Sequence, residues 1–344
     1  MFCFTLLILI VVFVGIRCRK KESEILDLTD TTTINGICVL FIFLSHSTQY
    51  FPLSNGFFDQ LYQHVQNIHN QWVVAPFLSF SGYGVMISII NKKEYIHYYP
   101  YKRILKTLVN FDIAILLYLV VGIIVGNVYS IPTIIGSFVG MTSIGNSNWY
   151  IFAILIMYLF SYIAARITED YGKQIILLFT GTVIYIVMMK CFGFEERFFS
   201  TIMCYPAGAA LGLYKDPIIN FLKKRKCISI IVMIILIAIT YKLRYNPLIM
   251  NISSIIFVAS IVWFLCFFMI QSRILSFFGK HAFSIFILQR IPGILISEFI
   301  LKYNINKYIL LIIDLIIVIA ISVIYDYFLK ILDRIILNKC EARN

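Results

Sequence analysis

Long apolar runs recur along the whole chain, and they limit the folds that it can adopt. A transmembrane helix needs about 20 mainly apolar residues, within a range of about 17 to 25. Eleven segments approach this length: residues 2–16, 34–51, 72–90, 107–126, 148–165, 174–192, 199–214, 227–241, 247–270, 282–300 and 308–329. The spacing therefore predicts an all-α, polytopic transmembrane helix bundle of about 11 spans, with one N-terminal helix added to a core of ten.

The composition agrees with a protein that lies in lipid. Of the 344 residues 60% are hydrophobic and only 13% are charged, and the mean hydropathy is +0.89. Soluble domains carry about twice that share of charge. The net charge of +12 resides in short clusters between the apolar runs, so we expect membrane lipid and not nucleic acid as the partner.

The distribution of basic residues predicts how the helices are oriented. Cytoplasmic loops of membrane proteins are enriched in Lys and Arg. With eleven spans and the N-terminus outside, the inner loops hold 22 of the 29 basic residues. The outer loops hold five, namely Arg197, Lys242, Arg244, Lys302 and Lys307. We therefore expect the N-terminus outside and the C-terminus inside.

The N-terminal run MFCFTLLILIVVFVGIRCRKK has its basic cluster after the apolar stretch and no small-residue cleavage site, so it is predicted to be an uncleaved first span. We expect three regions. Residues 1–30 form this helix and a basic cytoplasmic loop, residues 31–330 form the membrane domain, and residues 331–344 form a cytoplasmic tail.

Two outer segments are long enough to do more than connect helices. Ser54 to Gln71 carries apolar residues at helical spacing, which predicts a short amphipathic helix on the outer surface. Asn127 to Ser147 is free of charge and contains Gly and Pro, which suits a partly re-entrant loop buried in protein. For both, a simple interfacial cover is the plainer alternative.

The eight cysteines have no metal-ligand spacing and mostly lie in or beside apolar runs. We interpret them as small packing residues and expect no metal.

His46 interrupts the apolar run INGICVLFIFLSHSTQYF. A titratable side chain in a span is costly and is commonly functional. A general base is one interpretation, since histidine titrates near neutrality. An imidazole that hydrogen-bonds other helices is the alternative. Arg290 and Asp314 are further deep charges, and each of them needs a partner.

The segment FLSFSGYG is followed by a basic cluster of Lys102, Arg103 and Lys106. Ser81, Gly82 and Gly84 predict a close helix contact. The basic cluster fits ordinary cytoplasmic topology, and it equally fits a binding site for the phosphates of a cytoplasmic cofactor.

An ordered set of motifs resembles the acyltransferase family 3 of integral membrane O-acyltransferases, in particular its polysaccharide O-acetyltransferases. The motifs are NGICVLFIFLSH, FLSFSGYG, YKRILK, NWYIFAILIMYLF, CYPAGAALGLY and FFGKHAFSIFILQRIP, and they cover residues from about 30 to 330.

The resemblance implies a catalytic histidine at His46 and acetyl-CoA as the acyl donor. The family has Arg or Lys eleven positions before the histidine, whereas this chain has Asn35. We expect Asn35, Arg290 and the basic cluster of Lys102, Arg103 and Lys106 at the donor. Ser81, Tyr83, Trp149 and His69 are expected at the acceptor.

The predicted activity is transfer of an acetyl group from cytoplasmic acetyl-CoA to a hydroxyl of a surface or capsular polysaccharide, or of its lipid-linked precursor, at a bacterial cell membrane. The transfer is either direct or through a covalent acyl-histidine. A transporter or flippase for a lipid-linked glycan and a glycan polymerase are the alternatives, because intramembrane charges also mark transport pathways.

Overall fold

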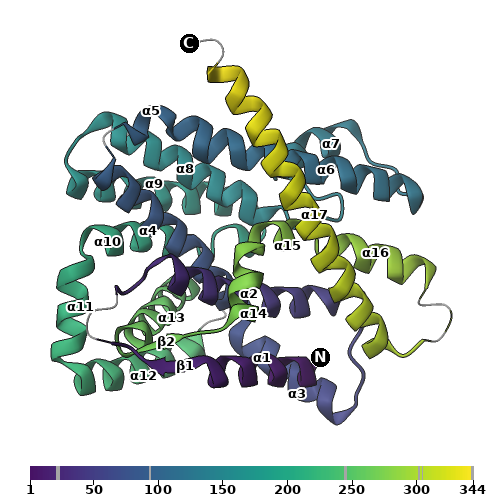
Figure 1. Cartoon of the computed structure of the whole chain (residues 1–344), viewed down its shortest axis with the longest axis horizontal. Helices are drawn as coiled ribbons and strands as arrows, with labels where there is room; N and C mark the ends of the chain where they lie inside the picture. Colours follow the sequence, from purple (N-terminus) through teal and green to yellow (C-terminus); the bar gives the residue numbers. More distant parts are fainter. Residues whose placement is uncertain (21–23, 93, 244–245, 301–302, 304, 342–344) are drawn as a thin grey trace.

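The computed structural model describes the chain except residues 21–23, 93, 244–245, 301–302, 304 and 342–344, and for residues 335–341 it describes the helix alone. Helices make up 81% of it. The strands of the described part are β1 (Ile16–Cys18) and β2 (Phe268–Ile270), which pair antiparallel. The predicted all-α helix bundle is confirmed (Figure 1).

Nine helical segments of the described chain are long and apolar enough to cross a membrane. Six of them are single helices, and each of the other three joins two or three consecutive helical elements. They are α2 (Leu28–Ser47), α3 (Phe57–His69) with η1 (Asn70–Val74) and α4 (Ala75–Asn91), α5 (Tyr95–Tyr99) with η2 (Pro100–Leu105) and α6 (Lys106–Ile124), α8 (Trp149–Ile167), α9 (Tyr171–Cys191), α12 (Lys226–Leu243), α13 (Pro247–Phe267), α15 (Ala282–Leu288) with α16 (Arg290–Phe299), and α17 (Lys307–Glu341).

The shorter helices account for the remaining expected spans and for several connections. They are α1 (Phe2–Gly15), α7 (Ile131–Phe138), η3 (Glu196–Phe198), α10 (Cys204–Leu213), α11 (Lys215–Lys224) and α14 (Arg273–Lys280). In Figure 1 α11 lies at the left edge and α7 at the upper right, while α17 crosses the front of the bundle. Every one of the eleven expected segments contains a helix. The predicted orientation relative to the membrane stays a prediction.

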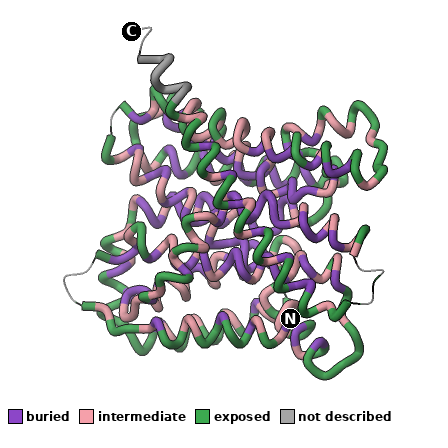
Figure 2. The backbone as a smooth tube through the Cα atoms, turned by 45° about the vertical axis from the view of Figure 1, so that its right-hand side comes forward, coloured by how far each residue is buried: buried purple, intermediate pink, exposed green. Residues whose placement is uncertain are grey.

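Buried residues concentrate in the middle of the bundle and exposed ones at its periphery (Figure 2). Helices α2, α4, α10 and α15 supply much of the buried core. Peripheral helices instead expose large apolar side chains, as α12 does with Ile231, Ile234 and Ile235. A soluble protein rarely exposes so much apolar surface, so these faces are suited to contact lipid tails.

The first expected span is a helix of 14 residues followed by a strand. Helix α1 is about 21 Å long at 1.5 Å per residue, and β1 adds about 10 Å. Together they approach the ~30 Å of a hydrocarbon core. The α1 end of this unit packs near α3, and β1 pairs with β2 directly after α13.

The seventh expected span begins later than the apolar run does. Residues 199–202 are buried and Met203 is half-buried, but none of them is helical, and α10 starts at Cys204. Asn251 of α13 explains this difference, because its Nδ2 donates to the Phe199 carbonyl (2.9 Å) and its Oδ1 accepts from the Met203 N–H (3.0 Å). Irregular backbone at membrane depth requires such protein partners.

Helix α2 begins six residues before the apolar run that predicted it. Asp27 caps its N-terminus by accepting from the Asp30 N–H at 2.7 Å. A side-chain acceptor at this position satisfies one of the unpaired donors of the first turn.

Both long outer segments contain a helix. The amphipathic helix expected within Ser54 to Gln71 is present as α3. Within Asn127 to Ser147, α7 is mostly exposed or half-buried, whereas the stretch after it buries Ile144, Asn146 and Ser147. The second half of this segment therefore agrees with the predicted buried loop.

Two pairs of helices meet backbone to backbone through glycine. A Cβ on Gly82 of α4 would lie 2.1 Å from the Tyr205 carbonyl of α10, and one on Gly208 would lie 1.9 Å from the Ser79 carbonyl. Between α2 and α14, Gly36 faces the Leu275 carbonyl in the same way. The close contact predicted from the serine-glycine motif is present at Gly82, whereas Gly84 faces open space.

We expect Gly82→Ala to destabilise the protein in detergent by about 1–3 kcal/mol or more, because the new methyl group would force the α4 and α10 backbones apart. Thermal unfolding followed by size-exclusion chromatography measures the change. Gly84→Ala is the matched control and should leave the unfolding midpoint nearly unchanged. Equal effects of the two substitutions would contradict the proposed backbone contact.

Candidate active site

A polar cavity of about 460 Å³ opens beside His46. Its walls come from α2, α3, η1, α8, η3 and the α15–α16 unit. Amides and hydroxyls dominate the lining, which includes Ser45, Gln49, Gln66, Asn67, Asn70 and Gln71. We call this space the outer cavity, because under the predicted orientation it lies toward the outer end of α2.

The imidazole of His46 lines this cavity. Its Nδ1 is buried and has no hydrogen-bond partner among the described residues. The ring packs near Phe286, at 6.4 Å between centroids. The alternative of an interhelical link would require a partner for the ring, so the geometry favours a functional role for His46.

Two guanidinium groups line the same cavity. Arg290 Nε is buried without a partner, and Arg290 Nη1 makes only a 3.5 Å contact with the Gly145 carbonyl. Arg197 pairs with Glu195 at 2.7 Å through Nη2, but its Nε is also unpartnered among the described residues. Buried donors of a cation are costly to leave unpaired, so these two Nε–H groups are candidates to donate hydrogen bonds to a ligand.

A second cavity, of about 320 Å³, lies at the other end of α2. It is lined by Leu28, Thr31, Thr32, Asn35, Val74, Phe77, Phe80, Ser81, Tyr150, Gly279, Lys280, Ala282, Phe283 and Phe286. We call it the inner cavity. Asn35 Oδ1 is buried there without a partner, and Lys280 is the cation among the described lining residues.

Val74 and Phe286 belong to the walls of both cavities. Tyr150 packs edge-on against Phe286, at 5.2 Å between centroids. Asn35 and His46 are eleven residues apart on α2, which places them on the same face and about 16 Å apart along the axis. One helix face therefore runs from the inner cavity, past an aromatic partition, to the outer cavity.

A break between α15 and α16 brings Arg290 to the outer cavity. Pro292 has no N–H, so the Leu288 carbonyl loses its helical donor and the helix is interrupted at Gln289. Sharp breaks of this kind are commonly caused by proline. The proline of the ILQRIP motif thus accounts for this local irregularity.

The predicted basic cluster does not converge on one point. Arg103 turns inward, where its Nε donates to the Tyr95 hydroxyl at 2.6 Å and its guanidinium lies 6.0 Å from the Tyr158 ring centroid. Lys102 lies over the exposed Tyr98 ring, and Lys106 pairs with Asp333 of α17.

The residues expected at the acceptor also separate. Trp149 lines the outer cavity, whereas Ser81 lines the inner cavity and hydrogen-bonds Tyr158 at 2.7 Å. Tyr83 lies under Lys215, and His69 packs on Phe41 at 5.4 Å between ring centroids. Neither Tyr83 nor His69 is among the described residues that line the two cavities.

Comparison with known proteins decides the class of chemistry. A family model described as an acyltransferase domain matches residues 33–327, which is most of the chain. The chain belongs to the acyltransferase 3 family. No curated protein and no solved structure matches it. The protein is therefore a multi-pass membrane acyltransferase, and the transporter and polymerase alternatives are set aside.

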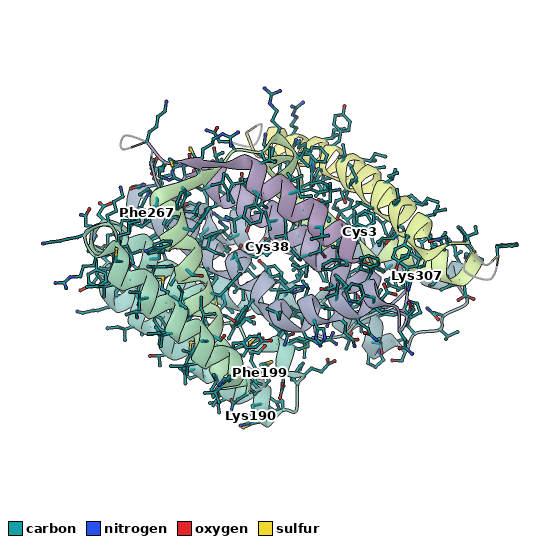
Figure 3. The ribbon with its side chains drawn as sticks, turned by 90° about the horizontal axis from the view of Figure 1, so that it is seen from below. Cys3, Cys38, Lys190, Phe199, Phe267 and Lys307 are labelled. Carbon is teal, nitrogen blue, oxygen red and sulfur yellow. The ribbon has the colours of Figure 1, made fainter. Side chains whose placement is uncertain are left out.

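Cysteine chemistry has no evident place in the acyltransferase. All seven cysteines whose side chains are described are free, and Cys38, Cys204 and Cys266 are buried. Figure 3 places Cys38 in the middle of the bundle. For the three buried cysteines this agrees with packing as their role, whereas Cys3, Cys18, Cys191 and Cys227 are exposed.

Sequence reasoning missed Arg197 and Lys280 as cavity residues of the acyltransferase. Lys280 had a recognisable signal, because it belongs to the motif FFGKHAFSIFILQRIP. Arg197 had no recognisable signal in the sequence, where it is one of the basic residues of the predicted outer loops. Its position depends on η3 folding back to the end of α8, a tertiary arrangement that no local pattern specifies.

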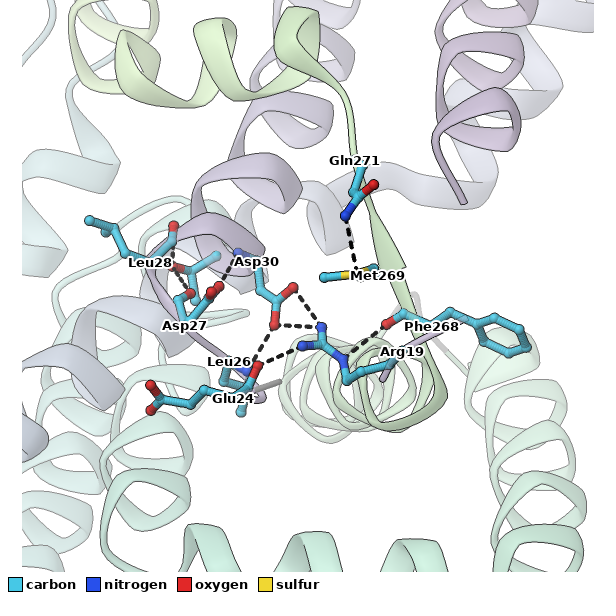
Figure 4. Close-up of polar contacts among 10 residues, drawn as sticks. Arg19, Glu24, Leu26, Asp27, Leu28, Asp30, Phe268, Met269 and Gln271 are labelled. Atoms are coloured by element: carbon cyan, nitrogen blue, oxygen red, sulfur yellow. Dashed lines mark hydrogen bonds and ion pairs between the residues drawn. The ribbon is translucent and has the colours of Figure 1, made fainter. Parts of the chain in front are cut away.

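The side chain of Arg19 is a buried charge of the acyltransferase that the sequence did not indicate. It donates to both carboxylate oxygens of Asp30, at 2.6 and 2.7 Å, and to the backbone carbonyls of Glu24 and Phe268 (Figure 4). The side chains of this pair are only 3% and 4% exposed. Leu28 and Thr31, on either side of Asp30 in the sequence, line the inner cavity. The Arg19–Asp30 ion pair therefore fixes the start of α2 beside this cavity.

We expect Asp30→Asn to destabilise the acyltransferase by about 3–5 kcal/mol, because it would leave a buried guanidinium without its charge partner. Denaturant unfolding in detergent measures the loss. Glu24→Gln is the control: the Glu24 carboxylate pairs with Lys215 at 3.0 Å but is 73% exposed, so its removal should cost at most about 1 kcal/mol. A loss for Asp30→Asn no larger than that of the control would refute a stabilising role.

Proposed function

We propose that this acyltransferase transfers an acetyl group from cytoplasmic acetyl-CoA to a hydroxyl of a cell-surface polysaccharide or its lipid-linked precursor, in a bacterial plasma membrane. The observation that carries the proposal is the pair of cavities at opposite ends of one face of α2, with Asn35 in one and His46 in the other. Donor and acceptor then approach the reacting atoms from opposite sides.

The inner cavity is the proposed entrance for the donor. Lys280 at its wall offers a positive charge to the phosphates of CoA. Arg103 supports the same region indirectly. Its guanidinium lies over the Tyr158 ring, and the Tyr158 hydroxyl hydrogen-bonds Ser81 in the cavity wall. Threonine hydroxyls and the free Asn35 Oδ1 give polar contacts for the amide groups of the pantetheine arm, which carries the acetyl thioester toward Val74 and Phe286.

His46 is the proposed general base. A ring nitrogen of the neutral imidazole takes the proton of the acceptor hydroxyl while the hydroxyl oxygen attacks the thioester carbonyl. The new C–O bond forms, the C–S bond breaks, and the CoA thiolate takes up the proton from the imidazolium. The donors on Arg290 and Arg197 hold the acceptor in the outer cavity, and Trp149 provides an aromatic wall for a sugar ring.

We expect His46→Gln to lower the rate of O-acetylation by at least ~100-fold, since general base catalysis contributes about 10²–10⁴-fold. Purified enzyme with radiolabelled acetyl-CoA and surface glycan gives the rate, and proton NMR of the cell's polysaccharide gives the acetyl content. His64→Gln, on the exposed side of α3, is the matched control and should acetylate normally. Normal acetylation by correctly inserted His46→Gln would refute the role of His46.

We expect Lys280→Gln to raise the KM for acetyl-CoA about fivefold, as the loss of a solvated charge pair worth ~1 kcal/mol implies. The kcat should change little, because the phosphates are distant from the thioester. Steady-state kinetics at saturating acceptor separate the two constants. Lys173→Gln, an exposed lysine in the first turn of α9, should leave both unchanged. An unaltered KM for Lys280→Gln would exclude Lys280 from the donor site.

A further inference from the structure

A third cavity, of about 290 Å³, lies on the far side of Arg290 from His46. Its lining includes Tyr50, Tyr118, Tyr129, Asn127 and Ser143. Tyrosine rings beside amide and hydroxyl groups suit a sugar ring, because the rings cover its apolar face while the polar groups bind its hydroxyls. Arg290 is a wall of both this space and the outer cavity.

The described lining of these two cavities carries positive charge only, although Arg197 is itself paired with Glu195 at 2.7 Å. Among the described residues that line them there are two arginines, Arg197 and Arg290, and no aspartate or glutamate. Arg290 makes no ion pair with any described carboxylate, and its Nε is buried without a partner. Asp314 of α17 is also buried, and both of its carboxylate oxygens lack a hydrogen-bond partner among the described residues, so it forms no ion pair with Arg290.

An uncompensated guanidinium inside a membrane bundle is costly and generally marks a substrate site. The planar fork of arginine matches a carboxylate or a phosphate, both of which accept two parallel hydrogen bonds. A neutral glycan would leave the Arg290 donors poorly satisfied. An anionic glycan would satisfy them and would compensate the charge.

We propose, on the basis of the acyl transfer proposed above, that the acceptor is an acidic glycan whose carboxylate or phosphate binds Arg290. The sugar to be acetylated lies in the outer cavity beside His46, and the neighbouring sugar lies among Tyr50, Tyr118 and Tyr129. Arg290 thereby selects an acceptor with a negative group next to the acetylated residue, and it fixes the register of the chain relative to His46.

The test compares three acceptor pools prepared from the de-O-acetylated surface polysaccharide of the host. One pool is native, one has its carboxylates reduced to alcohols, and one has its phosphates removed. Transfer from radiolabelled acetyl-CoA is measured for the wild type, Arg290→Gln and Arg290→Lys, with the KM for each pool and the KM for acetyl-CoA. Arg166→Gln, an exposed arginine in the last turn of α8, is the control.

The wild type should show a KM about 10- to 100-fold higher for the pool that has lost the anion, in the range that a charged hydrogen bond gives. The carboxyl-reduced and dephosphorylated pools tell which anion is recognised. For the native pool, Arg290→Gln should show the same raised KM, while its KM for acetyl-CoA stays unchanged. Arg290→Lys should keep part of the preference for the anionic pool. The Arg166→Gln control should match the wild type.

Equal KM values of the wild type for all three pools would overturn this inference while leaving acyl transfer to glycans intact. A preference that persists in Arg290→Gln would likewise overturn the assignment to Arg290. If the wild type acetylates none of the pools, the proposed function itself fails, and the acidic acceptor fails with it. The comparison of pools on the wild type decides the outcome even where a variant does not fold.

Discussion

Two pairs of helices in this bundle pack backbone to backbone at glycine, and the cavities lie beside these closely packed pairs. Gly36 and Gly279 let α2 and α14 touch, and Gly82 and Gly208 do the same for α4 and α10. In lipid, helices gain little from burying apolar surface, so close packing of small residues stabilises their association. One face of α2 packs against α14 in this way, and polar side chains on another face, including Asn35 and His46, line the two cavities.

Helix α2 connects the proposed donor site at the inner cavity with the proposed acceptor site at the outer cavity. Its inner end is held by the Asp27 cap and the Arg19–Asp30 ion pair, and its outer half presents His46. Tyr150 and Phe286 form an aromatic partition between the two cavities. In the function that we propose, the thin pantetheine arm reaches past this partition while the charged nucleotide end of CoA stays in the inner cavity. The acetyl group would then cross the membrane without either substrate crossing.

The sequence predicted the helices better than it predicted the neighbours of each side chain. Apolar runs and basic loops specified the eleven helical segments, and the titratable His46 within its span indicated a functional residue, which stays a prediction. The irregular start of α10 was not predictable, because it depends on Asn251 from a helix about 50 residues later. The sequence grouped Lys102, Arg103 and Lys106 as one cluster, yet helical geometry turns them in three directions. Arg197 and Arg290 meet His46 only through tertiary packing.

The most direct test of the central claim is acetyl transfer across a sealed membrane. Purified enzyme is reconstituted into vesicles in one orientation, with radiolabelled acetyl-CoA confined to the side of the basic loops and glycan confined to the opposite side. The account predicts labelled glycan and free CoA on opposite sides of an intact bilayer. Labelling that occurs only when donor and acceptor share one side would contradict the two-sided site.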